Sequence, residues 1–504
     1  MGIAFRFANL DLKVYGHDES HTLVRVAGFT RGEVKQRLVN GREIGIADIQ
    51  KFQRPNSERD WTCTVKALAT DDRQHTPLYF IIARLWAEWF GSSPAAFRSL
   101  PALLSVFMFP CVYWLCRELF RSSLVGWIAM AVVAISPLHL LYAQETRPYS
   151  LFSLATLLAS GALVRAMRVH TTPAWMAYAG SITLGLYSQL LFGLVLVGHG
   201  VYVVAMERFR ISRLCIAYAV CAVGAVVAFT PWLIIVAGNF SAIESLMGWA
   251  AIALPLPSMA KAWAGDFGRI FIDSGFMGPD LTSSNRHSGF FALLIALNLV
   301  AASMVLYSLW FLWRNTPKRV WLFVFTLIAS ASLPLIAADL VLGWHLSTTG
   351  RYLLPAYLGI QLAVSYLLAA TMQATGSVWH RRIWQQAGML LALSGVISCV
   401  FMSQAAVWWN HSHVYHNHSV ARIINRSSQA LLINEGTAME DLFSLSYLLN
   451  AKTRLQLVGN TAPEIADADR DIFLFRPSEA LRKELEKSYR LELVHQGGGL
   501  WQLK

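Results

Sequence analysis

Residues 214–236 read LCIAYAVCAVGAVVAFTPWLIIV and contain no charged side chain. About 20 consecutive apolar residues are what an α-helix needs to cross the hydrocarbon core of a bilayer. Nine further segments have the same character, so the sequence predicts an α-helical polytopic membrane protein with about 10–11 spans. The ten clearest spans are residues 97–117, 124–142, 149–168, 173–189, 190–206, 214–236, 289–312, 320–342, 352–372 and 387–405.

The overall composition agrees with this prediction. Of the 504 residues, 55% are hydrophobic and 14% are charged, whereas an ordinary soluble domain carries roughly 25% charged residues. The formal net charge of +12 would suit a nucleic-acid partner, but many of the basic residues lie in short connections between apolar runs. We therefore expect no nucleic acid. The six cysteines are scattered and indicate neither a disulfide framework nor a metal cluster.

The basic residues also predict how the chain is oriented. Alternate connections between the spans hold twelve lysines and arginines on one side and five on the other. Cytoplasmic loops are the ones enriched in these residues. We therefore expect a multi-pass protein of the cell membrane with both ends of the chain on the extracytoplasmic side.

Three regions follow from the placement of the spans. Alternating strand and helix patterns after the last span predict a small C-terminal α/β domain outside the membrane, with strands at 429–433, 454–458, 471–475 and 489–494 and helices at 437–449 and 479–487. Three glycines at 497–499 predict a turn before residues 500–503. The predicted regions are an outer loop of residues 1–96, a transmembrane helical domain of residues 97–405 with an outer loop at 237–288, and the α/β domain of residues 406–504.

One apolar stretch inside the first outer loop is too short to be a span. Residues 77–90 carry Arg84 and Glu88 four positions apart, where the two side chains can pair on one face of a helix. A span here would also break the alternation of charge between the loops. We therefore predict a helix that lies at the outer surface of the membrane.

Polar residues suited to chemistry occur in four short motifs, all on the outer side. Each motif has an alternative interpretation, because acidic pairs are often solvated turns and arginine–tyrosine pairs often anchor the ends of spans. Together they predict a site that meets a lipid headgroup and a water-borne partner. The motif residues are Asp18 and Glu19; Asp72, His75 and Tyr79; Glu145, Arg147 and Tyr149; and Arg351 and Tyr352.

The segment 408–418, WWNHSHVYHNH, contains four histidines within eight residues. Such a run could bind a metal ion. Its aromatic content and its position directly after a span favour an interfacial segment instead. We therefore assign no metal ligands.

Taken together, the four motifs resemble those of the C superfamily of membrane glycosyltransferases. The closest kin are the protein-mannosyltransferase-like proteins and the bacterial lipid A aminoarabinose transferases. The resemblance covers about residues 9–405 and departs from the usual His-Pro-Pro-Leu-Tyr motif at Thr76, where Pro77 keeps the extended entry into the helix. The family also begins with a span directly before the acidic pair. Because Met1 falls where that span would end, we expect the first span to be missing from this chain.

The resemblance implies a reaction in which a sugar moves, with inversion, from a polyprenyl-phosphate donor to an acceptor on the extracytoplasmic face. It makes Asp18 the general base, supported by Glu19, because a carboxylate must take the acceptor proton. Arg147 and Arg351 suit the lipid phosphate, which guanidinium groups bind bidentately. His75 would assist the leaving group. The other substrate-binding residues are Asp72, which positions His75 or the sugar, Tyr149 and Tyr352, which orient the leaving group, and Tyr79 and Glu145.

The implied partners are the polyprenyl-phosphate-linked sugar donor, membrane lipid, and an acceptor that is a glycan, a lipid or a protein. No cofactor is required, and a divalent cation remains possible. The main alternative is a transporter or flippase for a lipid-linked substrate, which predicts charges near the middle of several spans and repeat symmetry. A structural membrane protein with an outer interaction domain would explain the C-terminal domain but not the four motifs.

Overall fold

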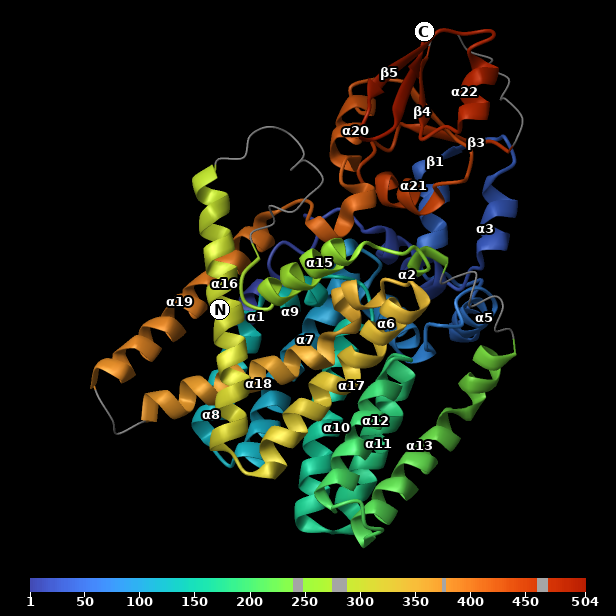
Figure 1. Ribbon diagram of the computed structural model, residues 1–504. Coiled ribbons are helices and arrows are strands. Elements are labelled where there is room, and N and C mark those ends of the chain that lie inside the picture. Colours follow the sequence, from blue (N-terminus) through green and yellow to red (C-terminus); the bar gives the residue numbers. More distant parts are fainter. Residues whose placement is uncertain (239–247, 274–287, 374–377, 460–469) are drawn as a thin grey trace.

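The computed structural model describes residues 1–238, 248–273, 288–373, 378–459 and 470–504 (Figure 1). All ten predicted spans are helical, which confirms the α-helical polytopic fold. They form α7 (Pro94–Phe120), α8 (Ser123–Ala134) with α9 (Pro137–Ala143), α10 (Tyr149–Val169), α11 (Thr172–Ser188), α12 (Phe192–Met206), α13 (Arg213–Ala237), α16 (Ser288–Asn315), α17 (Lys318–Leu342), α18 (Leu354–Gln373) and α19 (Val378–Gln404).

The lengths of these helices suit a bilayer. Among the described residues, seven helices are long and apolar enough to cross a membrane, and α8 with α9 adds an eighth if the bent pair is one span. The 17 residues of α11 and the 15 residues of α12 reach about 22–26 Å, slightly less than the ~30 Å hydrocarbon core. The chain is a multi-pass membrane protein.

The predicted span 124–142 is two helices rather than one. Pro137 is the first residue of α9, and proline disfavours the helical conformation in the residue before it. α8 therefore ends at Ala134, and α9 continues at an angle of 61°. The Ser136 hydroxyl donates a hydrogen bond of 2.7 Å to the carbonyl oxygen of Ile270 in the second outer loop. The bend leads the chain directly into the Glu145 motif.

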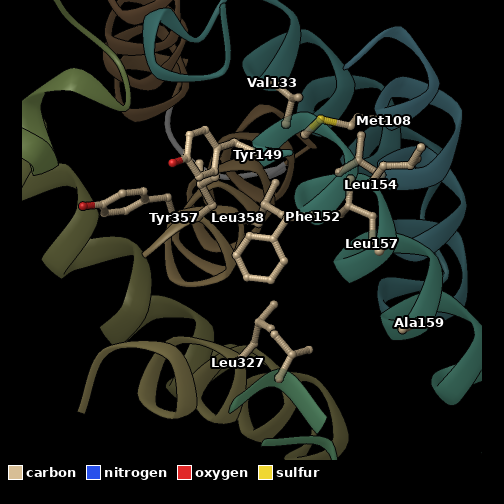
Figure 2. Packing of buried hydrophobic residues seen from close by; sticks show 14 of the residues in the cluster. Met108, Val133, Tyr149, Phe152, Leu154, Leu157, Ala159, Leu327, Tyr357 and Leu358 are labelled. Carbon is tan, nitrogen blue, oxygen red and sulfur yellow. The ribbon is translucent and has the colours of Figure 1, made fainter. Parts of the chain in front are cut away.

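The helical domain is packed around α10 and α18. In their most apolar windows 83% of the residues of α10 and 89% of those of α18 are buried, against 22% for α13. Figure 2 shows Phe152 and Leu157 of α10 packing among side chains of neighbouring helices, including Leu358 of α18 and Leu327 of α17. Outer helices such as α13 expose apolar side chains, which suits contact with lipid tails.

Short helices of the first outer loop pack against the spans. Leu23, Leu68 and Phe80 belong to the same buried apolar cluster as the spans. The predicted helix 77–90 is confirmed with the same bounds, and Arg84 and Glu88 form an ion pair at 2.8 Å. The helices of the loop are α1 (Gly2–Phe7), α2 (His17–Val26), α3 (Arg31–Leu38), α4 (Ile46–Gln50), α5 (Trp61–Asp71) and α6 (Pro77–Phe90).

A six-stranded sheet forms the C-terminal domain, and one of its strands comes from the first outer loop (Figure 1). The strand order is β1-β3-β2-β4-β6-β5, and β1 pairs antiparallel with β3, with Ile44 opposite Leu455. The four predicted strands are present, and a further strand follows the predicted turn at 497–499, but β1 was not predicted. The elements are β1 (Glu43–Gly45), α20 (Asn417–Ile424), β2 (Ala430–Asn434), α21 (Met439–Ser446), β3 (Arg454–Leu457), β4 (Asp471–Phe475), α22 (Glu479–Leu485), β5 (Leu491–His495) and β6 (Leu500–Leu503).

The two faces of this sheet pack against different partners. Leu432 and Leu455 face a core that includes Phe29 and Ile49 of the first outer loop. Leu431 and its neighbours face a smaller core that includes Leu481 of α22. Alternate residues of a strand point to opposite faces, so β2 contributes to both cores. The first outer loop and the C-terminal region therefore share a hydrophobic core.

This shared core gives a test of stability. Leu455 is fully buried and Leu493 is 43% exposed. Leu455→Ala should cost about 2–5 kcal/mol, the usual penalty for removing a buried leucine side chain, and Leu493→Ala should cost less than about 0.5 kcal/mol. The stability loss of each variant is measured by thermal unfolding of the purified protein, with limited proteolysis reporting on the sheet domain. Equal shifts for the two variants would contradict the described packing.

Candidate active site

The site is built on the first turn of α2. Gly16 precedes the helix, and its backbone N–H donates a hydrogen bond of 2.9 Å to Oε2 of Glu19. This is the return bond of a capping box, and it holds the start of the helix in place. Asp18 and Glu19 both lie in the first turn, where the helix dipole stabilises negative charge. Residues one apart point in different directions around a helix, so the two carboxylates face different surroundings.

Glu19 points into the protein. Its side chain is fully buried, and Arg98 of α7 donates from Nε to Oε1 at 2.9 Å and from Nη2 to Oε2 at 2.7 Å. The backbone N–H of Thr146 also donates to Oε1 at 2.8 Å. Burial alone would raise the pKa of Glu19, but Arg98 lowers it to about 2. Glu19 is therefore an ionised link between α2, α7 and the Glu145 motif.

Asp18 points toward the other motifs. Its Oδ2 lies 2.6 Å from Nη1 of Arg351, and its side chain is 31% exposed. Arg147, from the turn between α9 and α10, donates to the backbone oxygen of Asp18 at 3.3 Å and to the hydroxyl of Thr22 at 2.8 Å. Burial would raise the pKa of Asp18, but Arg351 and Arg147 hold it well below its ordinary value. One carboxylate thus faces two guanidinium groups.

His75 lies on the far side of Arg147. Its Nε2 is 3.3 Å from Nη2 of Arg147, which is also 3.3 Å from the hydroxyl of Tyr149. Burial and the nearby Arg147 charge lower the pKa of His75 to about 3, so the ring is neutral at pH 7. Nδ1 of His75 has no hydrogen-bond partner among the described residues. A neutral ring that accepts at Nε2 carries its proton at Nδ1.

Asp72 contacts side chains other than that of His75 through its carboxylate. Its carboxylate pairs with Arg25 and lies 3.6 Å from Nδ1 of His21. Its backbone oxygen accepts a hydrogen bond of 2.8 Å from the backbone N–H of His75. Burial would raise the pKa of Asp72, but His21 and Arg25 keep it well below its ordinary value. Asp72 thus helps to hold His75 through the main chain.

The remaining predicted residues line the same region. Tyr79 is fully buried, and neither its hydroxyl nor Oε2 of Glu145 has a hydrogen-bond partner among the described residues. Burial and the charges of Glu19 and Asp18 raise the pKa of Glu145 to about 8. The rings of Tyr149 and Tyr352 lie 5.9 Å and 5.5 Å from the Arg351 guanidinium carbon. All four motifs therefore converge on one site.

Sequence reasoning missed several residues that complete this arrangement. Arg98 is a charged residue near the start of an apolar span, and this position is the signal that could have revealed it. Lys13 is buried and donates to Oε1 of Gln144 at 2.6 Å, and burial together with Arg98 lowers its pKa to about 7. The ring of Trp249, from the second outer loop, lies 5.9 Å from the Arg351 guanidinium carbon. Nothing in the local sequence pointed to the contact of Lys13 with Gln144 or of Trp249 with Arg351.

The histidine-rich segment packs beside the acidic helix. Nε2 of His411 lies 3.8 Å from Oε2 of Glu19, and the rings of His413 and His17 are 5.4 Å apart. The indole N–H groups of Trp408 and Trp409 both donate to Oδ2 of Asp273, at 3.0 Å and 2.8 Å. No three His, Cys, Asp or Glu side chains within the described part of the chain gather in a metal-binding group.

Comparisons of the sequence and of the structure show which known proteins this chain resembles. Residues 74–235 match the sequence family of dolichyl-phosphate-mannose-protein mannosyltransferases. The structure matches ArnT from Cupriavidus metallidurans, solved bound to undecaprenyl phosphate, with a TM-score of 0.54 and 12% identity over 100% of this chain and 96% of that chain. The chain adopts the fold of the C-superfamily membrane glycosyltransferases. The resemblance drawn from the four motifs is confirmed.

A second solved structure with the C-superfamily fold is more distant. The archaeal oligosaccharyltransferase AglB from Archaeoglobus fulgidus, in complex with an inhibitory peptide and a dolichol-phosphate, matches with a TM-score of 0.50 and 11% identity. The match covers 89% of this chain and 63% of that chain. No curated protein sequence matches significantly. The family match at residues 74–235 includes the His75 and Arg147 motifs, whereas Asp18 and Arg351 lie outside it.

The different surroundings of the two acids predict different effects of mutation. Glu19→Gln leaves the buried Arg98 charge uncompensated, and breaking such a pair costs about 3–5 kcal/mol. Asp18→Asn removes a partly exposed pair with Arg351 and leaves a neutral amide beside it, which costs about 0–1 kcal/mol. Thermal unfolding of the purified variants measures the difference. A larger loss for Asp18→Asn would show that Asp18 is the structural member of the two.

The raised pKa of Glu145 predicts a dependence of stability on pH. A carboxyl group with a pKa of about 8 in the folded protein and an ordinary value near 4.3 when unfolded stabilises the fold fully below about pH 4 and loses this contribution as the pH rises toward 8. Glu145→Gln mimics the protonated form. The melting temperature of the wild type should therefore fall relative to that of Glu145→Gln between about pH 5 and 8. Parallel curves for the two proteins would contradict the assignment.

Proposed function

We propose that this protein transfers a sugar from a polyprenyl-phosphate donor to an acceptor on the extracytoplasmic face of the membrane. The observation that carries the proposal is the contact of 2.6 Å between Asp18 and Arg351, with Arg147 bonded to the same helix turn. A base and two phosphate-binding cations are thereby held at one place. The C-superfamily fold and the mannosyltransferase family match support the reaction class.

The two arginines suit the donor phosphate. Guanidinium groups bind phosphate oxygens through paired N–H donors and remain charged at every physiological pH. Arg351 lies in the short turn Gly350–Tyr352 and Arg147 in the turn between α9 and α10, so a phosphate between them would be held from two directions. Their positive charges stabilise the negative charge that develops on the phosphate as the glycosidic bond breaks. Tyr149 and Tyr352 flank Arg351 and would orient the leaving group.

Asp18 would act on the acceptor. The acceptor hydroxyl oxygen attacks the anomeric carbon, the bond from that carbon to the phosphate oxygen breaks, and the hydroxyl proton passes to Asp18. The products are the glycosylated acceptor and the polyprenyl phosphate. Because attack and departure occur on opposite faces of the sugar, the configuration at the anomeric carbon inverts. A phosphate held by arginines needs no divalent cation to leave.

The ion pair between Asp18 and Arg351 links donor binding to base strength. Without donor phosphate, Arg351 lowers the pKa of Asp18, which makes the carboxylate a weak base. A phosphate that takes up N–H donors of Arg351 weakens its hold on Asp18, and the proton affinity of the carboxylate rises. His75, neutral and with its Nδ1 proton unpaired, would donate a hydrogen bond to the departing phosphate. The base would thus be strengthened when the donor is in place.

The test is loss of transfer in a single-atom variant. Asp18→Asn should lower transfer about 10²–10⁴-fold, the usual contribution of a general base, at unchanged protein level. The readout is mass spectrometry of all glycoconjugates in membranes of cells that make the wild type, the variant or no protein. Asp11→Asn is the matched control, because Asp11 is an exposed acid of the same loop. An unchanged glycan profile in the Asp18→Asn membranes would refute Asp18 as the base.

A further inference from the structure

A cavity with polar and apolar lining lies beside the candidate active site. It has a volume of about 250 Å³ and lies between α2 and α3 of the first outer loop and α21 of the C-terminal domain, which are close together in Figure 1. None of the four motifs used above contributes a lining residue. The cavity is lined by His21, Val24, Arg25, Arg31, Val34, Lys35, Gly436, Thr437, Met439, Glu440 and Phe443.

The cavity and the active site share α2 and lie on either side of the contacts that Asp72 makes. His21 and Arg25 follow Asp18 by three and seven residues, so the three side chains lie along one face of α2. Asp72 links the two regions, because its carboxylate contacts Arg25 and His21 of the cavity while its backbone oxygen holds the N–H of His75. A molecule bound in the cavity would therefore end about one helical turn, roughly 5 Å, from Asp18.

The charges around the cavity largely cancel. Arg25 pairs with Asp72 and lies 3.1 Å from Asp71, and Arg31 lies 3.3 Å from Glu440. Burial lowers the pKa of His21 to about 4, so its ring is neutral at pH 7. Two of the three cations in the lining thus already have carboxylate partners. Such a site has fixed hydrogen-bonding groups but little net field to attract an anion.

The other part of the lining is apolar. Val24 and Phe443 are buried members of the core that the loop shares with the sheet domain, and Met439 packs against that core. Small-molecule sites commonly combine an apolar wall with a few placed polar groups, in volumes of roughly 300–1,000 Å³. A sugar ring presents C–H groups on one face and hydroxyls around its edge. The apolar wall suits the C–H face, and the arginine, histidine and glutamate groups suit the hydroxyls.

We propose that this cavity binds one or two uncharged sugar units of a glycan acceptor, so that a free hydroxyl of the glycan reaches Asp18. The name acceptor rests on the transfer reaction proposed above. The cavity offers a place for a second substrate between α2, α3 and α21, on the same helix as Asp18. Residues of α2 would serve both substrates, with Asp18 at one end of the helix face and Arg25 at the other.

The test uses the purified full chain, fluorescently labelled in detergent micelles, on an array printed with neutral oligosaccharides, anionic oligosaccharides and peptides. Two variants address the cavity: Thr437→Trp fills it and Glu440→Gln removes a hydroxyl-binding charge. We expect the wild type to bind neutral oligosaccharides and both variants to bind at least about ten-fold more weakly, as for loss of a polar contact built for a hydroxyl. Asp18→Asn should bind like the wild type, because Asp18 lies outside the lining.

Matched controls separate the cavity from general damage. Ser428→Trp lies before β2, at the opposite end of that strand from Thr437, and Glu479→Gln changes an acid of α22 that is 69% exposed. Both should bind glycans like the wild type, and all variants should retain undecaprenyl phosphate in native mass spectrometry. No binding to neutral oligosaccharides, equal binding by the cavity variants, or a preference for peptides or anionic oligosaccharides would overturn the proposal.

The result is independent of the proposed reaction. If the cavity variants lose glycan binding while Asp18→Asn still supports the native glycan profile, the cavity stands and the catalytic proposal fails. If Asp18→Asn abolishes transfer while the cavity variants bind normally, the reaction stands and the cavity proposal fails.

Discussion

The buried ion pair between Glu19 and Arg98 is the interaction on which the candidate site depends. Both side chains are fully buried, and a buried charge is tolerated only with a well-placed partner. Arg98 also donates to the backbone oxygens of Leu10 and Val14, and Glu19 accepts from Thr146. The first loop, the first span and the Glu145 motif therefore have one mutual arrangement that satisfies all of these groups. Because Glu19 is held by Arg98, the preceding residue, Asp18, points toward Arg351 and Arg147.

The two ends of the chain meet on the face of the helical domain that holds the candidate site. β1 from the first loop forms the edge of the C-terminal sheet beside β3. The first loop and the C-terminal domain also share one apolar core. Asp441 of α21 lies 3.0 Å from His17 and also pairs with Arg476. These contacts fix α21 beside α2, which creates the cavity next to the candidate site. The site is made by the first loop and the membrane helices, and among the described residues the sheet domain contributes only to the adjoining cavity.

The helices were predictable because each depends on its own local sequence. An apolar run of span length has one stable conformation in a bilayer, whatever its neighbours, and residues 77–90 were assigned with the bounds that the structure has. β1 was missed because three residues are too short for a strand pattern and their partner lies about 400 residues away. The break at Pro137 had a local signal, but the apolar run on both sides masked it. Arg98 was assigned to a span because the sequence does not show that Glu19, 79 residues earlier, is its partner.

The sequence by itself determined the membrane fold, the positions of the ten helical segments and the four polar motifs, because these follow from runs and spacings within short windows. Tertiary structure alone decided that Arg351 pairs with Asp18 rather than Glu19, that Arg98 neutralises Glu19, and that a cavity opens beside α2. These pairings join residues up to 333 positions apart, and they form only when the helices pack and remove the charges from water. Local sequence specifies which groups are available, and the requirement that every buried charge find a partner specifies how they meet.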